Sequence, residues 1–206
     1  MPQDRAIRTR EAILQAAGEL FGERGYHGTS TTDILARCGV TRGALYFHFP
    51  AKEHIADAVI AHQETALSVP ERSSPLQATI ALTFHYADAI VHDPVMRGAV
   101  RLSVEQATYR APDATPYESP ERAVRTLLEN SAKRDELLDS ADPPTIARLL
   151  VGAFTGVQLV SDAMTRRRDL TQRVSHLWRF LLPGIARPSL LPHLRVPDTG
   201  VEEVLL

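Results

Sequence analysis

The chain has 206 residues, of which 44% are hydrophobic and 23% are charged, and its formal net charge is −2. This length allows one large domain or a small domain joined to a larger one, and so small a net charge identifies no partner. The single cysteine excludes an intramolecular disulfide, and the polar start "MPQDRAIRTR" has no apolar signal region. We interpret no later run as long enough to cross a bilayer, and we expect a cytoplasmic protein without a membrane segment.

Three short helices are predicted near the start of the chain. Within 9–24, apolar residues recur on one helix face. Ser30 and Asp33 have the S-x-x-D spacing of a capping box, which opens a second helix. Thr41 is suited to cap a third helix, and Pro50 must end it. The short connection between the second and third helices is typical of a helix-turn-helix.

The third predicted helix carries residues suited to DNA. The second and third predicted helices would form the helix-turn-helix, in which the N-terminal residues of the later helix enter the major groove. Arg42 lies there, and its guanidinium can bind O6 and N7 of guanine together, while Gly43 has no Cβ to hinder a close approach. Hydroxyl, imidazole and ammonium groups nearby can bind phosphates, as can the free N–H groups at the start of the second helix. The candidate DNA contacts are Thr31, Thr41, Arg42, Gly43, Tyr46, His48 and Lys52.

Local charge favours DNA binding but leaves a second interpretation open. Four basic residues and one acidic residue lie within 24–52, and the arginines between Arg5 and Arg10 are expected to form a basic arm ahead of the first helix. Solvated faces also carry charged runs, and Leu45 and Phe49 are spaced as core residues. The pattern alone is therefore consistent with a DNA-binding helix and with an ordinary core helix.

The rest of the chain is also predicted to be helical. A proline-rich stretch, Tyr109 to Pro120, is predicted as a loop, and no alternating strand pattern occurs. The predicted class is all-α, with a DNA-binding domain over 1–50 and a second domain over 51–206. Further helices are predicted over 51–66, 76–91, 95–107, 121–138, 145–164 and 170–185.

Motifs of common enzyme classes are missing from the sequence. There is no G-x-S-x-G elbow, phosphate-binding glycine loop or dinucleotide fingerprint. The 8 histidines show no H-x-x-x-H or Cys/His pairing of the kind that binds a metal. We therefore predict no catalytic residue, no metal site and no cofactor.

A family resemblance favours DNA binding. The block from Thr9 to Ile60, with "LFGERGYHGTS" and "ILARCGVTRGALYFHFPAKE", resembles the N-terminal domain of the tetracycline-repressor (TetR) family. The resemblance implies a three-helix DNA-binding head joined to a larger all-α domain for ligand binding and dimerisation. It also implies a homodimer on a palindromic operator, with the candidate DNA contacts at positions where the family contacts DNA. The last two long predicted helices would form a four-helix bundle with a twofold mate, unless their apolar faces only pack against their own domain.

Three later stretches are similar to one branch of that family. "DPVMRGAVRLSVE", "TPYESP" and "LLVGAFTGVQLVSD" resemble the γ-butyrolactone autoregulator receptors, including those that sense furans and butenolides. Such proteins repress antibiotic biosynthesis until a small signal releases them. A signal of this kind needs an apolar cavity with a few polar groups aimed inward. The candidate ligand-binding residues are Glu64, Phe84, Ser103, Tyr117, Thr155 and Gln158, with Tyr117 expected in a loop at the entrance.

One departure from that branch bears on the ligand. Its receptors tend to carry a tryptophan where this sequence has Pro120. The pocket would then be reshaped, as in pseudo-receptors that answer to antibiotics or their intermediates. Thr155 and Gln158 equally suit contacts with a neighbouring helix, and a DNA-binding protein without a ligand is the remaining alternative.

Overall fold

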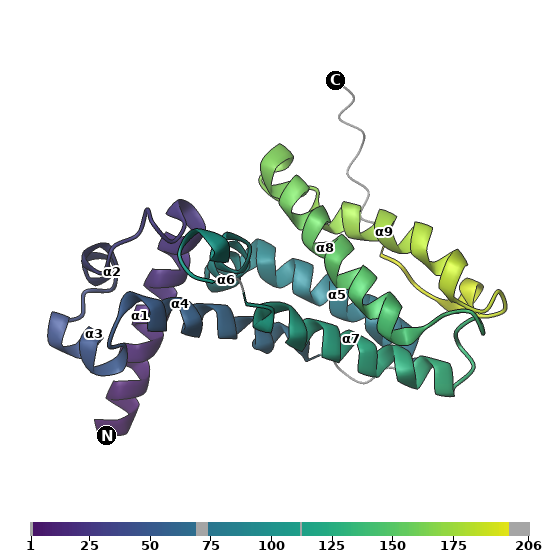
Figure 1. Cartoon of the computed structure of the whole chain (residues 1–206), viewed down its shortest axis with the longest axis horizontal. Helices are drawn as coiled ribbons and strands as arrows, with labels where there is room; N and C mark the ends of the chain where they lie inside the picture. Colours follow the sequence, from purple (N-terminus) through teal and green to yellow (C-terminus); the bar gives the residue numbers. More distant parts are fainter. Residues whose placement is uncertain (1, 69–73, 112, 198–206) are drawn as a thin grey trace. The chain divides into compact units, whose positions relative to one another are not determined.

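A computed structural model describes residues 2–68, 74–111 and 113–197 of the chain (Figure 1). These residues form helices and contain no β-strand, apart from an isolated backbone bridge between Leu137 and Ala186. The predicted all-α class is confirmed. The α-helices are α1 (Pro2–Arg24), α2 (Thr31–Cys38), α3 (Arg42–His48), α4 (Lys52–Ala61), α5 (Pro75–His92), α6 (Pro94–Glu105), α7 (Thr115–Lys133), α8 (Pro143–Thr165) and α9 (Leu170–Ile185), and short 3₁₀ helices are η1 (His62–Leu67), η2 (Gln106–Thr108) and η3 (Leu191–His193).

The described residues divide into two compact units. The first is drawn from 1–65 and 89–116, and the second from 66–88 and 117–206. Each unit is therefore assembled from two separate stretches of chain. The first unit contains the predicted helix-turn-helix together with α4 and α6, so the three N-terminal helices share their unit with a helix far along the chain.

Close contact between α1 and α6 forms the centre of the first unit. A Cβ added at Gly98 would lie 2.4 Å from the carbonyl oxygen and 2.9 Å from the Cα of Gly18. Arg101 donates to the carbonyl oxygen of Gly22 at 3.1 Å, and the Glu105 carboxylate accepts from the Tyr26 N–H at 3.2 Å. The surrounding core includes Ile13, Leu20, Phe21, Ile34, Leu45, Ile55, Val59 and Leu102.

Local capping explains the two short helices. The Ser30 hydroxyl accepts from the Asp33 N–H at 3.1 Å, and the Asp33 carboxylate accepts from the Ser30 N–H at 2.9 Å, which completes the predicted capping box. Gly39 ends α2 with a φ of 68°, a left-handed conformation that suits glycine. The Thr41 hydroxyl then accepts from the Ala44 N–H at 3.2 Å, so α3 begins where predicted.

Several helix ends differ from the prediction. The arginines expected in a basic arm lie on α1, which begins at Pro2. The helix predicted over 51–66 is an α-helix only to Ala61 and continues as η1. The helix predicted over 121–138 begins earlier and ends at Lys133.

The predicted loop from Tyr109 to Pro120 is helical from Thr115 onward. The Asp113 carboxylate accepts from the N–H of Thr115 at 3.0 Å and so holds the start of α7. A proline in a first helical turn loses no hydrogen bond, because that N–H has no partner within the helix. Tyr117, expected in a loop, lies in the first turn of α7. Pro120 lies inside the same helix, beyond its first turn.

Buried polar contacts hold the second unit together. The fully buried Trp178 of α9 donates from Nε1 to the Thr83 hydroxyl of α5 at 2.7 Å. The buried carboxylate of Glu136 accepts from the N–H of Leu76 at 2.9 Å. These bonds satisfy polar groups that would otherwise be costly inside an apolar core.

The expectation of no membrane-length apolar run was wrong for α8. This helix of 23 residues has a window of mean hydropathy 1.3, enough by length and composition to cross a membrane, although 33% of that window is buried inside the protein. Core helices of soluble proteins have the same length and composition, so this property alone is weak evidence for a membrane.

We predict that Gly98→Ala lowers the free energy of unfolding by about 1 to 3 kcal/mol, because the new methyl group meets backbone atoms of α1. Gly43→Ala is the matched control, since nothing lies within 4 Å of a Cβ there and alanine favours a helix. Urea unfolding followed by circular dichroism measures both. A Gly98→Ala protein as stable as the control would contradict the packing described here.

Candidate nucleic-acid interface and effector site

Helix α3 has one buried edge and one exposed face. Leu45 is fully buried and Phe49 nearly so, as their spacing predicted. Thr41, Arg42 and Gly43 at the start of the helix are exposed. The exposed fractions of Tyr46 and Phe47 are 37% and 81%. A short helix whose inner edge is fixed in the core can present its other face to a groove of DNA.

Three of the candidate DNA contacts lie together. The Arg42 guanidinium is 5.6 Å from the centroid of the Tyr46 ring. The Tyr46 hydroxyl is 3.5 Å from the hydroxyl of Thr31 in the first turn of α2. His48 lies at the end of α3, with its ring edge-on to Phe47 at 5.1 Å between centroids. The arrangement joins the start of α2 to the exposed face of α3.

Lys52 begins α4 beside an aromatic ring. Its ammonium lies 3.9 Å from the centroid of Tyr26. Burial lowers the pKa of Lys52, because partial loss of hydration disfavours the charged form, and the neighbouring Glu53 carboxylate opposes that shift. The side chain is half-buried, with its ammonium against the Tyr26 ring.

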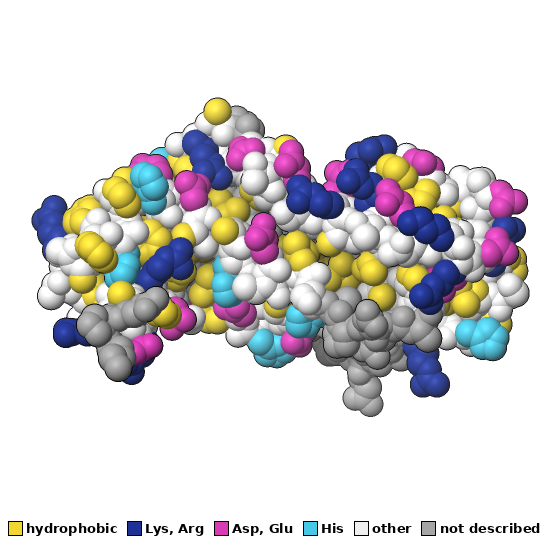
Figure 2. Space-filling model, turned by 90° about the horizontal axis from the view of Figure 1, so that it is seen from below, with side chains coloured by type: hydrophobic (Ala, Val, Ile, Leu, Met, Phe, Trp, Pro, Cys, Tyr) yellow, Lys and Arg dark blue, Asp and Glu magenta, His cyan; other side chains and the backbone are white. Residues whose placement is uncertain are grey.

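Two of the local basic residues are already paired. Arg37 lies 2.8 Å from the Glu19 carboxylate and 3.6 Å from that of Glu23, both on α1. Arg24 lies 4.0 Å from Asp33. The excess of basic residues counted within 24–52 therefore overestimates the positive charge of this surface, because Glu19 and Glu23 of α1 lie on it as well. Figure 2 shows one face of the molecule, on which basic and acidic side chains are mixed.

The six candidate ligand residues fall in both units. Glu64 and Ser103 belong to the first unit, and Phe84, Tyr117, Thr155 and Gln158 to the second. Ser103 is buried, accepts from Nε2 of Gln63 at 2.9 Å and donates to the Ala99 carbonyl at 2.8 Å. Glu64 is exposed on η1. The Thr155 hydroxyl donates to the Val151 carbonyl within α8 at 2.9 Å.

Gln158 differs from the other polar candidates. Only 3% of its surface is exposed, and its Oε1 has no hydrogen-bond partner among the described residues. An unsatisfied buried carbonyl costs free energy, so native proteins seldom keep one without a reason. A ligand that donates a hydrogen bond would supply the missing partner.

An aromatic group that the sequence analysis overlooked lies near this glutamine. The Tyr86 ring of α5 packs edge-on against Phe154 of α8, with 5.6 Å between centroids. Phe154 precedes Gln158 by four residues and so shares a face of α8 with it. Burial raises the pKa of Tyr86, and the nearby Tyr117 adds to that shift. Tyr86 was detectable as a hydroxyl-bearing aromatic within the apolar pattern of α5.

Both parts of the chain match known sequence families. Residues 13–59 match "Bacterial regulatory proteins, tetR family", and residues 73–187 match "Tetracyclin repressor-like, C-terminal domain". The A-factor receptor protein of Streptomyces griseus is 37% identical over 200 residues, which cover 97% of this chain and 71% of that protein.

Solved structures resemble the chain over most of its length. TylP, a TetR regulator from Streptomyces fradiae, is 39% identical with a TM-score of 0.85 and covers 94% of this chain and 93% of its own. A γ-butyrolactone receptor described as ArpA-like is 30% identical with a TM-score of 0.72, covering 92% and 93%. CprB from Streptomyces coelicolor, solved with its biological operator sequence, is 31% identical with a TM-score of 0.74, covering 92% and 94%.

The helix-turn-helix, the all-α body and these full-length similarities agree. The chain belongs to the TetR family of bacterial transcriptional regulators, which are DNA-binding proteins and not enzymes.

Proposed function

We propose that this regulator represses transcription as a homodimer on a palindromic operator in the cytoplasm and is released by a small signalling molecule. The signal is of the butyrolactone, furan or butenolide type, and the regulated process is antibiotic biosynthesis. The observation that carries the DNA-binding part is the exposed N-terminal turn of α3, held by the buried Leu45. The similarity to the A-factor receptor protein supports the signal class.

Each head is proposed to read DNA through α3. Arg42 lies where a guanidinium can bind a guanine edge, and the exposed Gly43 lets the backbone approach the base pairs. Thr31, Thr41, Tyr46, His48 and Lys52 supply donors for phosphates around that contact. Two heads about 34 Å apart then occupy successive major grooves.

Dimerisation is proposed through α8 and α9 of the second unit. Large apolar side chains are exposed on both helices, including Met164 at 69% and Phe180 at 87%. Exposed apolar patches of this kind mark interfaces. A twofold mate would cover them as a four-helix bundle, which also accounts for the apolar composition of α8.

The effector is proposed to bind beside Gln158, Tyr86 and Phe154. The carbonyl of Gln158 accepts a hydrogen bond from the effector, while the aromatic rings cover its apolar part. Effector binding shifts the population toward a state in which the two heads no longer fit successive grooves. Operator DNA must then weaken effector binding by the same factor.

A second candidate function is a pseudo-receptor that answers to an antibiotic or a biosynthetic intermediate. It is favoured by Pro120, which lies within α7 where autoregulator receptors tend to carry a tryptophan. A proline covers far less apolar surface than an indole, so the ligand beside it would differ in shape. The same DNA-release experiment, performed with compounds of both classes, separates the two candidates.

We predict that Arg42→Ala weakens operator binding at least tenfold in a gel-shift titration, because each head loses a contact worth about 1 to 3 kcal/mol. The probe is DNA upstream of the protein's own gene. Arg122→Ala removes an exposed arginine of α7 and serves as the control with unchanged affinity. Equal affinity of the two variants would exclude Arg42 from the interface.

We predict that Gln158→Leu abolishes release of that DNA by the compound that releases the wild-type protein, chosen from butyrolactones, furans, butenolides and antibiotics. The variant should be at least as stable as the wild type in thermal unfolding, because a buried carbonyl without a partner is replaced by an apolar group of similar size. An unaltered release concentration would remove Gln158 from the effector site. If no compound releases the wild type, a ligand-independent repressor is favoured.

We predict that Phe180→Glu converts the dimer to a monomer in analytical ultracentrifugation, because it places a charge at the centre of the proposed interface. Operator affinity should fall as the two heads lose their linkage. Arg179→Glu, which changes the charge of the exposed neighbouring residue, tests whether charge alone is responsible. A dimeric Phe180→Glu protein would place the interface elsewhere.

A further inference from the structure

A stack of side chains connects the segment after α6 to the start of α4. The Tyr26 ring is 3.9 Å from that of Tyr109, with 15° between the planes. The ammonium of Lys52 is also 3.9 Å from the Tyr26 centroid. Because a stacked ring already covers one face of Tyr26, the ammonium lies over the other. Tyr26 therefore contacts both Lys52, at the start of α4, and an aromatic residue from far along the chain.

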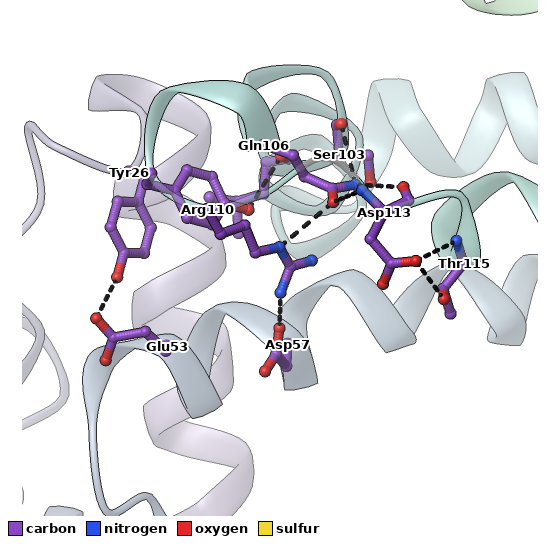
Figure 3. Close-up of polar contacts among 10 residues, drawn as sticks. Tyr26, Glu53, Asp57, Ser103, Gln106, Arg110, Asp113 and Thr115 are labelled. Atoms are coloured by element: carbon purple, nitrogen blue, oxygen red, sulfur yellow. Dashed lines mark hydrogen bonds and ion pairs between the residues drawn. The ribbon is translucent and has the colours of Figure 1, made fainter.

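Tyr26 has little freedom to move. It is nearly fully buried, and its hydroxyl donates to the Glu53 carboxylate at 2.8 Å, as Figure 3 shows. Its backbone N–H donates to Glu105 at the end of α6. Tyr109 is fixed in turn, because its hydroxyl donates to the Leu102 carbonyl at 3.1 Å. The ring on which Lys52 rests is thus supported by α6 and the residues that follow it.

The segment carrying Tyr109 is also attached to α4. The buried Gln106 accepts at Oε1 from the Asp113 N–H at 3.1 Å and from Nε of Arg110 at 3.3 Å. Arg110 forms an ion pair with Asp57, one turn along α4 from Glu53 (Figure 3). The guanidinium of Arg110 lies 5.5 Å from the Tyr109 centroid. These contacts keep Tyr109 in register with the first turns of α4.

We propose that Tyr109 is a positioning residue for operator binding, acting through Tyr26 to hold the Lys52 ammonium ready for a phosphate. The proposal rests on the proposed function, in which Lys52 contacts DNA. A free lysine must lose most of its rotamer freedom when it binds a phosphate. An ammonium already confined against an aromatic face loses less, so binding is tighter without any added contact.

The test is a salt titration of operator binding by the full-length protein. The probe is the duplex that the wild-type protein selects from a random-sequence pool. Each phosphate contact contributes about 0.9 to the slope of log affinity against log salt. The proteins compared are the wild type, Lys52→Ala, Tyr109→Leu, Tyr109→Phe and the double variant Lys52→Ala with Tyr109→Leu.

The expected result has three parts. Lys52→Ala lowers the slope by about 0.9 for each head. Tyr109→Leu, which keeps apolar volume but removes the stacked ring, weakens binding severalfold at each salt concentration and leaves the slope unchanged, because Lys52 can still bind its phosphate. Tyr109→Phe keeps the ring but loses the hydrogen bond to the Leu102 carbonyl, so it weakens binding less than Tyr109→Leu. In the double variant the tyrosine substitution has no further effect, because its target is already absent.

Other outcomes overturn the proposal in distinguishable ways. If the two substitutions reduce affinity additively, Tyr109 acts elsewhere, and if Tyr109→Leu alters thermal stability but not operator affinity, its role is only structural. A slope unchanged in Lys52→Ala removes the phosphate contact and the proposal, while leaving the Arg42 contact intact. A wild-type protein that selects no duplex refutes both this proposal and the proposed function.

Discussion

The contact between the backbones of α1 and α6 is the constraint on which the first unit depends. Glycine at both Gly18 and Gly98 lets the two helices approach so closely that a Cβ at either position would lie within 3.0 Å of a backbone atom of the other helix. At that distance Arg101 can reach the end of α1, and Glu105 can reach the N–H of Tyr26. This close approach therefore supports Tyr26 through Glu105. Tyr26 in turn holds the start of α4 through its hydrogen bond to Glu53. A wider crossing would separate the same side chains from their partners.

Features set by neighbouring residues were predicted well from the sequence. The capping box of Ser30 and Asp33 and the cap at Thr41 depend on contacts within a few residues. The core positions Leu45 and Phe49 were predicted from their spacing four residues apart, and both are buried. The end predicted for the helix over 51–66 was wrong, because the change from α4 to the 3₁₀ helix η1 involves no residue that breaks a helix. The loop predicted over 109–120 was wrong from Thr115 onward, because Pro116 lies in the first turn of α7, where a proline is tolerated, and Pro120 lies inside the helix despite its lost N–H.

The candidate sites were only partly accessible to sequence reasoning. Residue types identified the face of α3, since its chemistry and spacing are local. The Tyr26 and Tyr109 stack joins residues from the two separate stretches of the first unit, and nothing in a single sequence pairs them. Gln158 was chosen as a polar residue within an apolar pattern, but its unsatisfied carbonyl is visible only when every neighbour is placed. The residue assignments for DNA and effector therefore remain proposals.

The first unit is discontinuous in sequence, and this affects how the protein is made. Its early residues, 1–65, pack against α6, which lies within the later stretch 89–116. During translation, the apolar side of α1 emerges before its partner helix has been synthesised. A nascent chain that ends before α6 lacks Glu105, and with it the acceptor for the Tyr26 backbone. The core of the first unit can therefore be completed only after the ribosome has passed well beyond the helix-turn-helix.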